Sequence, residues 1–153
     1  MTIRRTLLAA CATLAVSGAA QGQAQAQHLR IGLAEDPDIM DPTLARTFVG
    51  RIVFASLCDK LFDIDARLNI IPQLATGYEW ADPKTLVIKL RAGVTFHDGK
   101  KMDAEAVKYS LERHLTMQGS FRRSEINSME SVEVVDPLTV RVVLKEPFAP
   151  FVA

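Results

Sequence analysis

The stretch Thr85–Glu112, TLVIKLRAGVTFHDGKKMDAEAVKYSLE, contains a local reason for each boundary of a strand–turn–strand–turn–helix unit. In its first part, Leu86, Ile88 and Leu90 occupy alternate positions. Alternate residues of a strand point to the same face, so the pattern predicts a strand over Thr85–Leu90 with one face more deeply buried than the other.

Two turns and a helix complete the stretch. Gly93 and Gly99 mark turns, and Gly99 suits a backbone with positive φ. Between these turns we expect an extended segment, Val94–Phe96. Asp103 is a good N-cap for a helix over 104–115. The apolar positions of that helix share one stripe: Ala104, Val107, Leu111 and Leu115.

The flanking sequence predicts further antiparallel pairs. Tyr78–Trp80 should form a strand joined to Thr85–Leu90 by a proline-containing turn. Toward the C-terminus, Ser131–Val135 and Thr139–Leu144 predict a β-hairpin around Asp136-Pro137-Leu138. A polar link without a predicted helix precedes this hairpin. Two further segments are expected to be extended, Phe62–Asp65 and the apolar Pro147–Phe151.

Nearer the N-terminus, we expect a strand, a loop and a helix. Leu29–Leu33 alternates like a strand and leads into an acidic loop with prolines, Glu35–Pro42. Thr47–Phe62 lacks proline and is apolar almost all round, which predicts a helix buried on most of its surface. Cys58 lies among these apolar residues, so we expect it to be a small buried core residue rather than a reactive thiol.

Residues 1–26 have the three parts of an export signal. Met1–Arg5 is short and basic, Thr6–Ala20 is apolar and uncharged, and Ala24-Gln25-Ala26 offers the small residues that precede a cleavage site. The apolar run is shorter than the roughly 20 residues of a membrane span. We therefore predict a signal peptide, 1–26, and a periplasmic mature protein. The alternatives are a buried N-terminal helix, lipidation at Cys11 and a twin-arginine signal.

Charge and cysteine content exclude several classes of partner. The chain has 18 Lys+Arg and 18 Asp+Glu, and the signal holds two arginines and no acid, so the mature part has a net charge of −2. Nucleic acid is therefore not an expected partner, because phosphate binding needs clustered positive charge. Once Cys11 leaves with the signal, Cys58 is the single thiol, and neither an internal disulfide nor a cysteine metal site can form.

No residue pattern in the chain predicts catalysis. His97 precedes Asp98-Gly99 and is expected to be a turn residue, and His114 flanks the helix stripe and is expected to be structural. There is no nucleophile elbow and no glycine-rich phosphate loop. Asp36, Asp38 and Asp41 lack the glycine and terminal glutamate of a calcium loop. We therefore expect no enzyme activity, no cofactor and no metal site.

The chain carries an ordered set of short motifs. They are Asp41-Pro42, Leu61-Phe62, Pro72–Ala75, Tyr78–Trp80, Leu86–Leu90, Phe96–Gly99, Asp103–Val107, Val132–Val140 and Pro147–Phe151. Each motif alone is weak, but their order along nearly the whole mature chain is specific. The set resembles one protein family, the family-5 extracellular solute-binding proteins of ABC importers, the peptide- and nickel-binding group.

The resemblance implies an α/β protein similar to type II periplasmic binding proteins, of which this chain is the N-terminal portion. It implies that 27–46 is the first strand and loop of the large lobe, and that 47–153 is the small α+β extra domain with the start of the return to the lobe. The implied role is capture of a solute, with a peptide favoured, and delivery to an inner-membrane permease. We expect a monomer.

In that family the segment after Asp41-Pro42 borders the solute cleft. By position, this makes Ala45, Arg46, Thr47 and Phe48 candidate ligand-binding residues, and Arg46 could meet a peptide carboxylate. Alternatively, these residues merely start a helix.

Because members of the family are much longer, this chain is expected to be a fragment with poor solubility and no measurable solute affinity. The remaining alternatives are a non-functional remnant and a secreted hydrolase whose site lies in missing sequence. The identity of the solute cannot be read from these residues.

Overall fold

The computed structural model describes residues 28–152. The predicted signal peptide, 1–26, lies outside the described residues. The chain divides into two compact units, 1–32 and 33–153, and the account below concerns the second. The strand predicted at Leu29–Leu33 is not formed, and Leu29 is 85% exposed. A strand needs a hydrogen-bonded partner, and no strand within residues 28–152 pairs with this segment.

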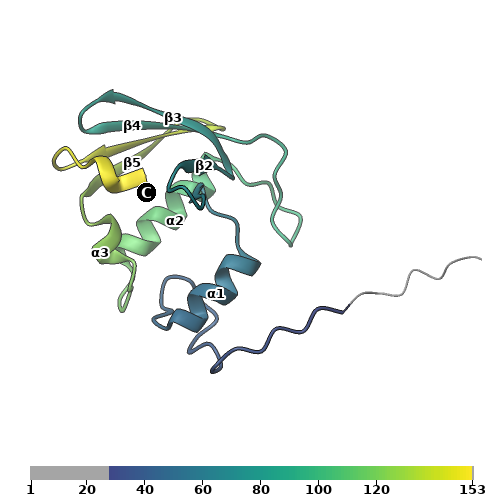
Figure 1. Cartoon of the computed structure of the whole chain (residues 1–153). Helices are drawn as coiled ribbons and strands as arrows, with labels where there is room; N and C mark the ends of the chain where they lie inside the picture. The colour runs from purple at the N-terminus through teal and green to yellow at the C-terminus, as the bar shows by residue number, and fades with distance from the viewer. Residues whose placement is uncertain (1–27, 153) are drawn as a thin grey trace, which may run out of the picture. The chain divides into compact units, whose positions relative to one another are not determined.

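A four-stranded antiparallel sheet confirms both predicted hairpins (Figure 1). The strands are β3 (Ala75–Asp82), β4 (Thr85–Leu90), β5 (Met129–Asp136) and β6 (Thr139–Leu144), in the order β3-β4-β6-β5. The two hairpin turns share one device, since the aspartate that ends the first strand accepts a hydrogen bond from a backbone amide two residues on. The Asp82 and Asp136 carboxylates each lie 2.8 Å from that amide nitrogen.

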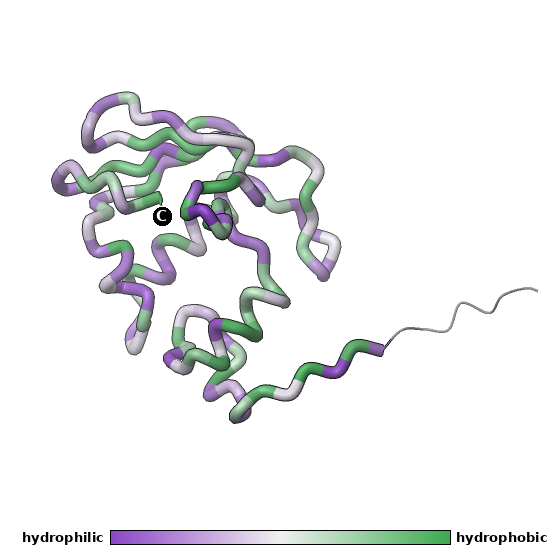
Figure 2. Tube along the Cα trace, in the orientation of Figure 1, coloured by the Kyte–Doolittle hydropathy of each residue, from purple (hydrophilic) through white to green (hydrophobic). Residues whose placement is uncertain are grey.

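Helix α2 (Ala104–Thr116) lies against β5 and β6. The predicted N-cap is confirmed, because the Asp103 carboxylate accepts a hydrogen bond from the Ala106 amide at 3.1 Å. Apolar and polar residues alternate along the strands in Figure 2, and the apolar ones face the helix stripe. The buried core consists of Ala75, Leu86, Ile88, Leu90, Met102, Ala104, Val107, Met129, Val132, Val140, Val142 and Leu144.

Helix α1 (Phe48–Leu57) is shorter and much more exposed than the sequence predicts. Of its ten residues only Val49 and Gly50 are buried, and Phe48 is 76% exposed. The prediction of a helix buried on most of its surface is therefore wrong for this structure, because no second layer within residues 28–152 covers it. Cys58, predicted to be buried, is exposed as well. It adopts an extended backbone that ends the helix.

A small hairpin follows α1. Its strands, β1 (Phe62–Ile64) and β2 (Ile70–Pro72), pair antiparallel. The turn between them holds Leu68 at φ 63°, a left-handed conformation that is costly for a residue with a Cβ. Gly99 has positive φ, as predicted, and so does Gly93, which was predicted only to mark a turn. The segment Val94–Phe96 takes part in a single bridge, from Thr95 to Lys101.

Two further segments differ from the sequence prediction. The polar link contains a short helix, α3 (Arg123–Ile126). The segment Pro147–Phe151 was predicted to be extended, but Ala149–Val152 forms a 3-10 helix, η1. In η1 the side chains of Phe151 and Val152 pack against the core. Partial burial of these two apolar side chains favours the 3-10 helix over an extended segment. None of the helices in residues 28–152 has the length and apolar character that crossing a membrane requires.

Candidate functional site

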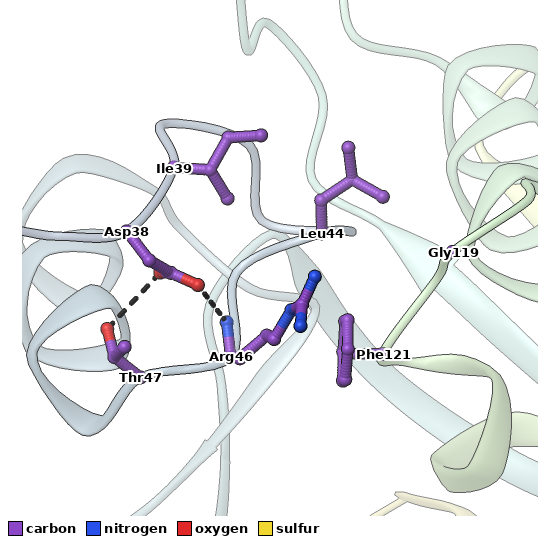
Figure 3. A pocket seen from close by; sticks show the side chains of 7 residues that line it. All are labelled: Asp38, Ile39, Leu44, Arg46, Thr47, Gly119 and Phe121. Atoms are coloured by element: carbon purple, nitrogen blue, oxygen red, sulfur yellow. Dashed lines mark hydrogen bonds between the residues drawn. The ribbon is translucent and has the colours of Figure 1, made fainter.

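The loop that precedes α1 and the segment between α2 and α3 form the two walls of a cavity of about 500 Å³ (Figure 3). We call residues 38–47 the pocket loop. The lining residues are Asp38, Ile39, Leu44, Arg46 and Thr47 from this loop, and Gly119 and Phe121 from the other wall.

Arg46 and Phe121 both line the cavity, and their side chains stack against each other (Figure 3). The guanidinium carbon of Arg46 lies 4.5 Å from the centre of the Phe121 ring, a favourable cation–π distance. Both residues are exposed. Within residues 28–152, the Arg46 guanidinium has no carboxylate within 4.0 Å. The cavity therefore presents a cation without an ion-pair partner beside an apolar aromatic surface.

Asp38 fixes the backbone of the pocket loop. Its carboxylate accepts hydrogen bonds from the Arg46 amide at 3.1 Å and from the Thr47 hydroxyl at 3.2 Å. Desolvation would raise the pKa of Asp38, but these hydrogen bonds outweigh it and lower the pKa below its ordinary value. Thr47 also caps α1, since its hydroxyl oxygen accepts a hydrogen bond from the Gly50 amide at 3.0 Å.

Of the four residues predicted to bind ligand, two line the cavity and two do not. Arg46 and Thr47 line the cavity. Ala45 is only 3% exposed, and its carbonyl accepts a hydrogen bond from the Arg122 guanidinium at 3.0 Å. Phe48 is exposed and does not line the cavity. The structure thus brings two of the four candidates together, and assignment of all four to a solute site stays a prediction.

Sequence reasoning missed the other lining residues. The sequence analysis considered Asp38 only as a calcium ligand. Its position nine residues before Thr47, which caps a helix, was a weak sign that its carboxylate bonds to that end of the loop. Nothing in the sequence places Phe121 beside Arg46, since 75 positions separate them. Only the packing of the two walls brings these side chains together.

Five polar side chains, which we call the polar junction, tie the pocket loop to the end of α2 and the start of α3. They are Asp41, Thr43, Arg113, His114 and Arg122. Arg113 binds both carboxylate oxygens of Asp41, at 3.1 and 2.5 Å, and donates to the Thr43 hydroxyl. The hydrogen bond from Arg113 lowers the pKa of Asp41 to about 2, and the same pairing raises the pKa of Arg113.

The sequence analysis expected structural roles for His97 and His114, and these assignments stay predictions. His114 Nδ1 lies 2.9 Å from the Thr43 hydroxyl. Burial, together with the charges of Arg113 and Arg122, lowers the pKa of His114. His97 is exposed in its turn. Among residues 28–152, no group of three or more His, Cys, Asp or Glu side chains could hold a metal ion.

Comparison with known proteins identifies the family. Residues 69–153 match the model described as bacterial extracellular solute-binding proteins, family 5 Middle. The glutathione-binding protein GsiB of Pectobacterium atrosepticum is 34% identical over 99% of this chain and 30% of its own length. In GsiB of Salmonella paratyphi A, the match covers 28% of that protein. The chain therefore spans less than a third of the curated relatives it matches.

Solved structures agree with this result. The nickel ABC transporter from Bacillus halodurans is 35% identical, with a TM-score of 0.65 over 76% of this chain and 24% of that one. The oligopeptide-binding protein AppA from Bacillus subtilis, solved with a nonapeptide, is 25% identical, with a TM-score of 0.68 over 72% of this chain and 22% of that one. These relatives are binding proteins rather than enzymes, and the fold of this chain is that of the N-terminal portion of a type II periplasmic binding protein. With more than half of its residues matched by the family model, the chain belongs to the family-5 bacterial extracellular solute-binding proteins.

Proposed function

We propose that this chain is part of the substrate-binding component of an ABC importer, which captures a peptide in the periplasm and delivers it to an inner-membrane permease. Family membership supports the general role. The export signal predicted at residues 1–26 supports the location. The pocket loop is then one wall of the solute site, with Arg46 and Thr47 as the residues nearest the solute.

The observation that carries the proposal is the guanidinium of Arg46 at the cavity. It has an aromatic neighbour, Phe121, and no carboxylate partner in the described part of the chain. A guanidinium binds a carboxylate through two parallel hydrogen bonds. Peptides carry a carboxylate, and they also carry amide groups that suit the Thr47 hydroxyl. The relatives include a protein named for glutathione, itself a tripeptide, and one solved with a nonapeptide, which supports the peptide class.

The test is calorimetric titration of the protein expressed from the complete reading frame that contains these residues. Reduced glutathione, di- and tripeptides, a nonapeptide and a nickel–histidine complex serve as probes. We expect saturable binding of a peptide. Saturable binding of the nickel complex alone would replace the peptide assignment with a metal-chelate one, which the nickel-transporter relative makes the main competitor.

Arg46→Ala tests the site itself. Loss of a charge-assisted hydrogen bond costs about 1.5–3 kcal/mol, so the dissociation constant should rise roughly tenfold to a hundredfold. The matched control is Arg67→Ala, since Arg67 is also an exposed arginine but lies in the β1–β2 turn. Equal dissociation constants for the Arg46→Ala variant and the unmodified protein would refute the assignment.

A further inference from the structure

The peptide group between Ala45 and Arg46 is held at both of its polar ends. Its N–H belongs to Arg46 and donates to the Asp38 carboxylate at 3.1 Å, within the pocket loop. Its C=O belongs to Ala45 and accepts from Nη2 of Arg122 at 3.0 Å, from the other wall of the cavity. Because a peptide group is planar, hydrogen bonds at both ends fix its plane, and with it the point from which the Arg46 side chain starts.

The other wall also holds the far end of the Arg46 side chain. The guanidinium carbon of Arg46 lies over the Phe121 ring, 4.5 Å from its centre. Phe121 precedes Arg122 in the chain, and its amide donates to the Thr43 carbonyl at 3.0 Å. Two adjacent residues of one wall therefore hold Arg46, one at its backbone and one at its guanidinium.

The Arg122 side chain has a fixed direction of its own. It is 19% exposed, and its Nη1 donates to the Glu125 carboxylate at 2.8 Å. A guanidinium presents its donors in a rigid planar fork, so the bond to Glu125 also sets the direction of the bond to Ala45. Ala45 is only 3% exposed, so little water can take the place of the guanidinium there.

Arg123, the next residue in the chain, has a different role. Its guanidinium donates to the Leu115 carbonyl at 2.8 Å and to the Met117 carbonyl at 3.0 Å, both at the C-terminal end of α2. Of these two neighbouring arginines, Arg122 is the one that bonds to the residue before Arg46. The pair allows an effect on the pocket loop to be separated from an effect on fold stability.

We propose that Arg122 is a positioning residue for the candidate solute site. It is not among the residues that line the cavity, and it acts by orienting the Arg46 guanidinium toward the solute carboxylate. The inference rests on the proposed function, in which Arg46 binds that carboxylate. Loss of the Arg122–Ala45 bond frees one end of the peptide group, so the Arg46 guanidinium loses its fixed place beside Phe121.

Nuclear magnetic resonance of the solute-free protein, expressed from the complete reading frame with isotope-labelled arginine, reads the placement of Arg46. The ring current of Phe121 displaces the Arg46 Nε–H resonance from its position in a Phe121→Leu variant, which serves as the reference. We expect Arg122→Met to lose most of this displacement and Arg123→Met to retain it. An unchanged displacement in Arg122→Met would overturn the proposal.

A double-mutant cycle with the tightest-binding peptide separates positioning from a general structural role. With Arg46 present, Arg122→Met should raise the dissociation constant about fivefold, the effect of losing roughly one net hydrogen bond. In the Arg46→Ala background the same substitution should change it by less than about twofold, because no guanidinium is left to orient. Equal increases in both backgrounds would show that Arg122 supports only the fold, and would overturn the proposal.

Arg123→Met is the matched control for both measurements. It removes the hydrogen bonds to the end of α2, so it should lower the free energy of unfolding but leave the dissociation constant within about twofold. A rise as large as that in Arg122→Met would attribute the weaker binding to lost stability and contradict the proposal. Arg122→Gln, whose side chain ends well short of the position of Nη2, should reproduce Arg122→Met and replaces it if that variant does not fold. Exchange protection of the β4 amides reports folding in each variant.

Failure of the proposed function has a different signature from failure of this inference. Absence of any peptide binding, together with a displaced Arg46 resonance in Arg122→Met, would refute the proposed function and leave the placement of Arg46 by Arg122 intact. Equal peptide affinity in the unmodified protein and in Arg122→Met would leave the proposed function intact and overturn the positioning role.

Discussion

Replacement of Asp41 by Asn should destabilise the second unit measurably, because Asp41 neutralises a partly buried arginine, Arg113. The pKa of Asp41 falls from an ordinary 3.8 to about 2, and each pKa unit corresponds to about 1.4 kcal/mol, which gives an upper value of about 2.5 kcal/mol. The Arg113 and Asp41 side chains are 28% and 25% exposed, so solvent screens part of the interaction. We expect Asp41→Asn to lower the free energy of unfolding by about 1–2 kcal/mol at pH 7.

The pH dependence gives the sign of the effect. A depressed carboxylate pKa stabilises the fold above about pH 4, and this contribution is lost as the pH falls through 3.8 toward 2. The difference between the unmodified chain and the Asp41→Asn variant should therefore shrink in the same range.

The assay is urea unfolding of the 153-residue chain at low concentration, followed by fluorescence of Trp80, its single tryptophan. The control is Glu133→Gln, which breaks an ion pair with Arg141 whose side chains are 52% and 43% exposed. It should cost less than about 0.5 kcal/mol. Equal costs for the two variants, or a cost for Asp41→Asn that persists at pH 2, would refute the reasoning.

Two further predictions concern the scaffold and use the same assay. Leu86→Ala removes a fully buried core side chain from β4, the strand between β3 and β6, and should cost roughly 2–5 kcal/mol. Leu57→Ala, at an exposed position, should change the free energy of unfolding by less than about 0.5 kcal/mol; similar costs for the two variants would show that Leu86 is not a core residue. Asp103→Ala removes the N-cap of α2 and should lower the free energy of unfolding by about 1 kcal/mol. Asp103→Asn, which can still cap the helix, should retain most of that stability. An Asp103→Ala variant as stable as the unmodified chain would show that the cap contributes nothing.

Local chemistry explains what the sequence predicted correctly. Leu86, Ile88 and Leu90 alternate, and the structure buries all three on one face. Asp103 begins a helix and Gly99 adopts positive φ, because each preference belongs to the residue and its nearest neighbours. Such features need no knowledge of distant parts of the chain.

The burial of α1 and the pairing of residues far apart in the sequence could not be predicted from local sequence patterns. The apolar pattern of Thr47–Phe62 predicted a buried helix, yet burial needs a second layer that the pattern does not supply. The polar junction joins Asp41 to Arg113 across 72 positions, and both residues also suit an exposed surface. Arg46 and Thr47 were identified through the family resemblance, whereas Phe121 became a candidate only when the two walls of the cavity were placed.

The most direct test of a solute site on the pocket loop is hydrogen exchange of the complete protein with and without a bound peptide. We predict that the peptide slows exchange at residues 45–48 and 119–121, the segments that carry the lining residues Arg46, Thr47, Gly119 and Phe121. Protection confined to residues 76–79, which line a second cavity of about 260 Å³ on β3, with no change at residues 45–48, would contradict the account.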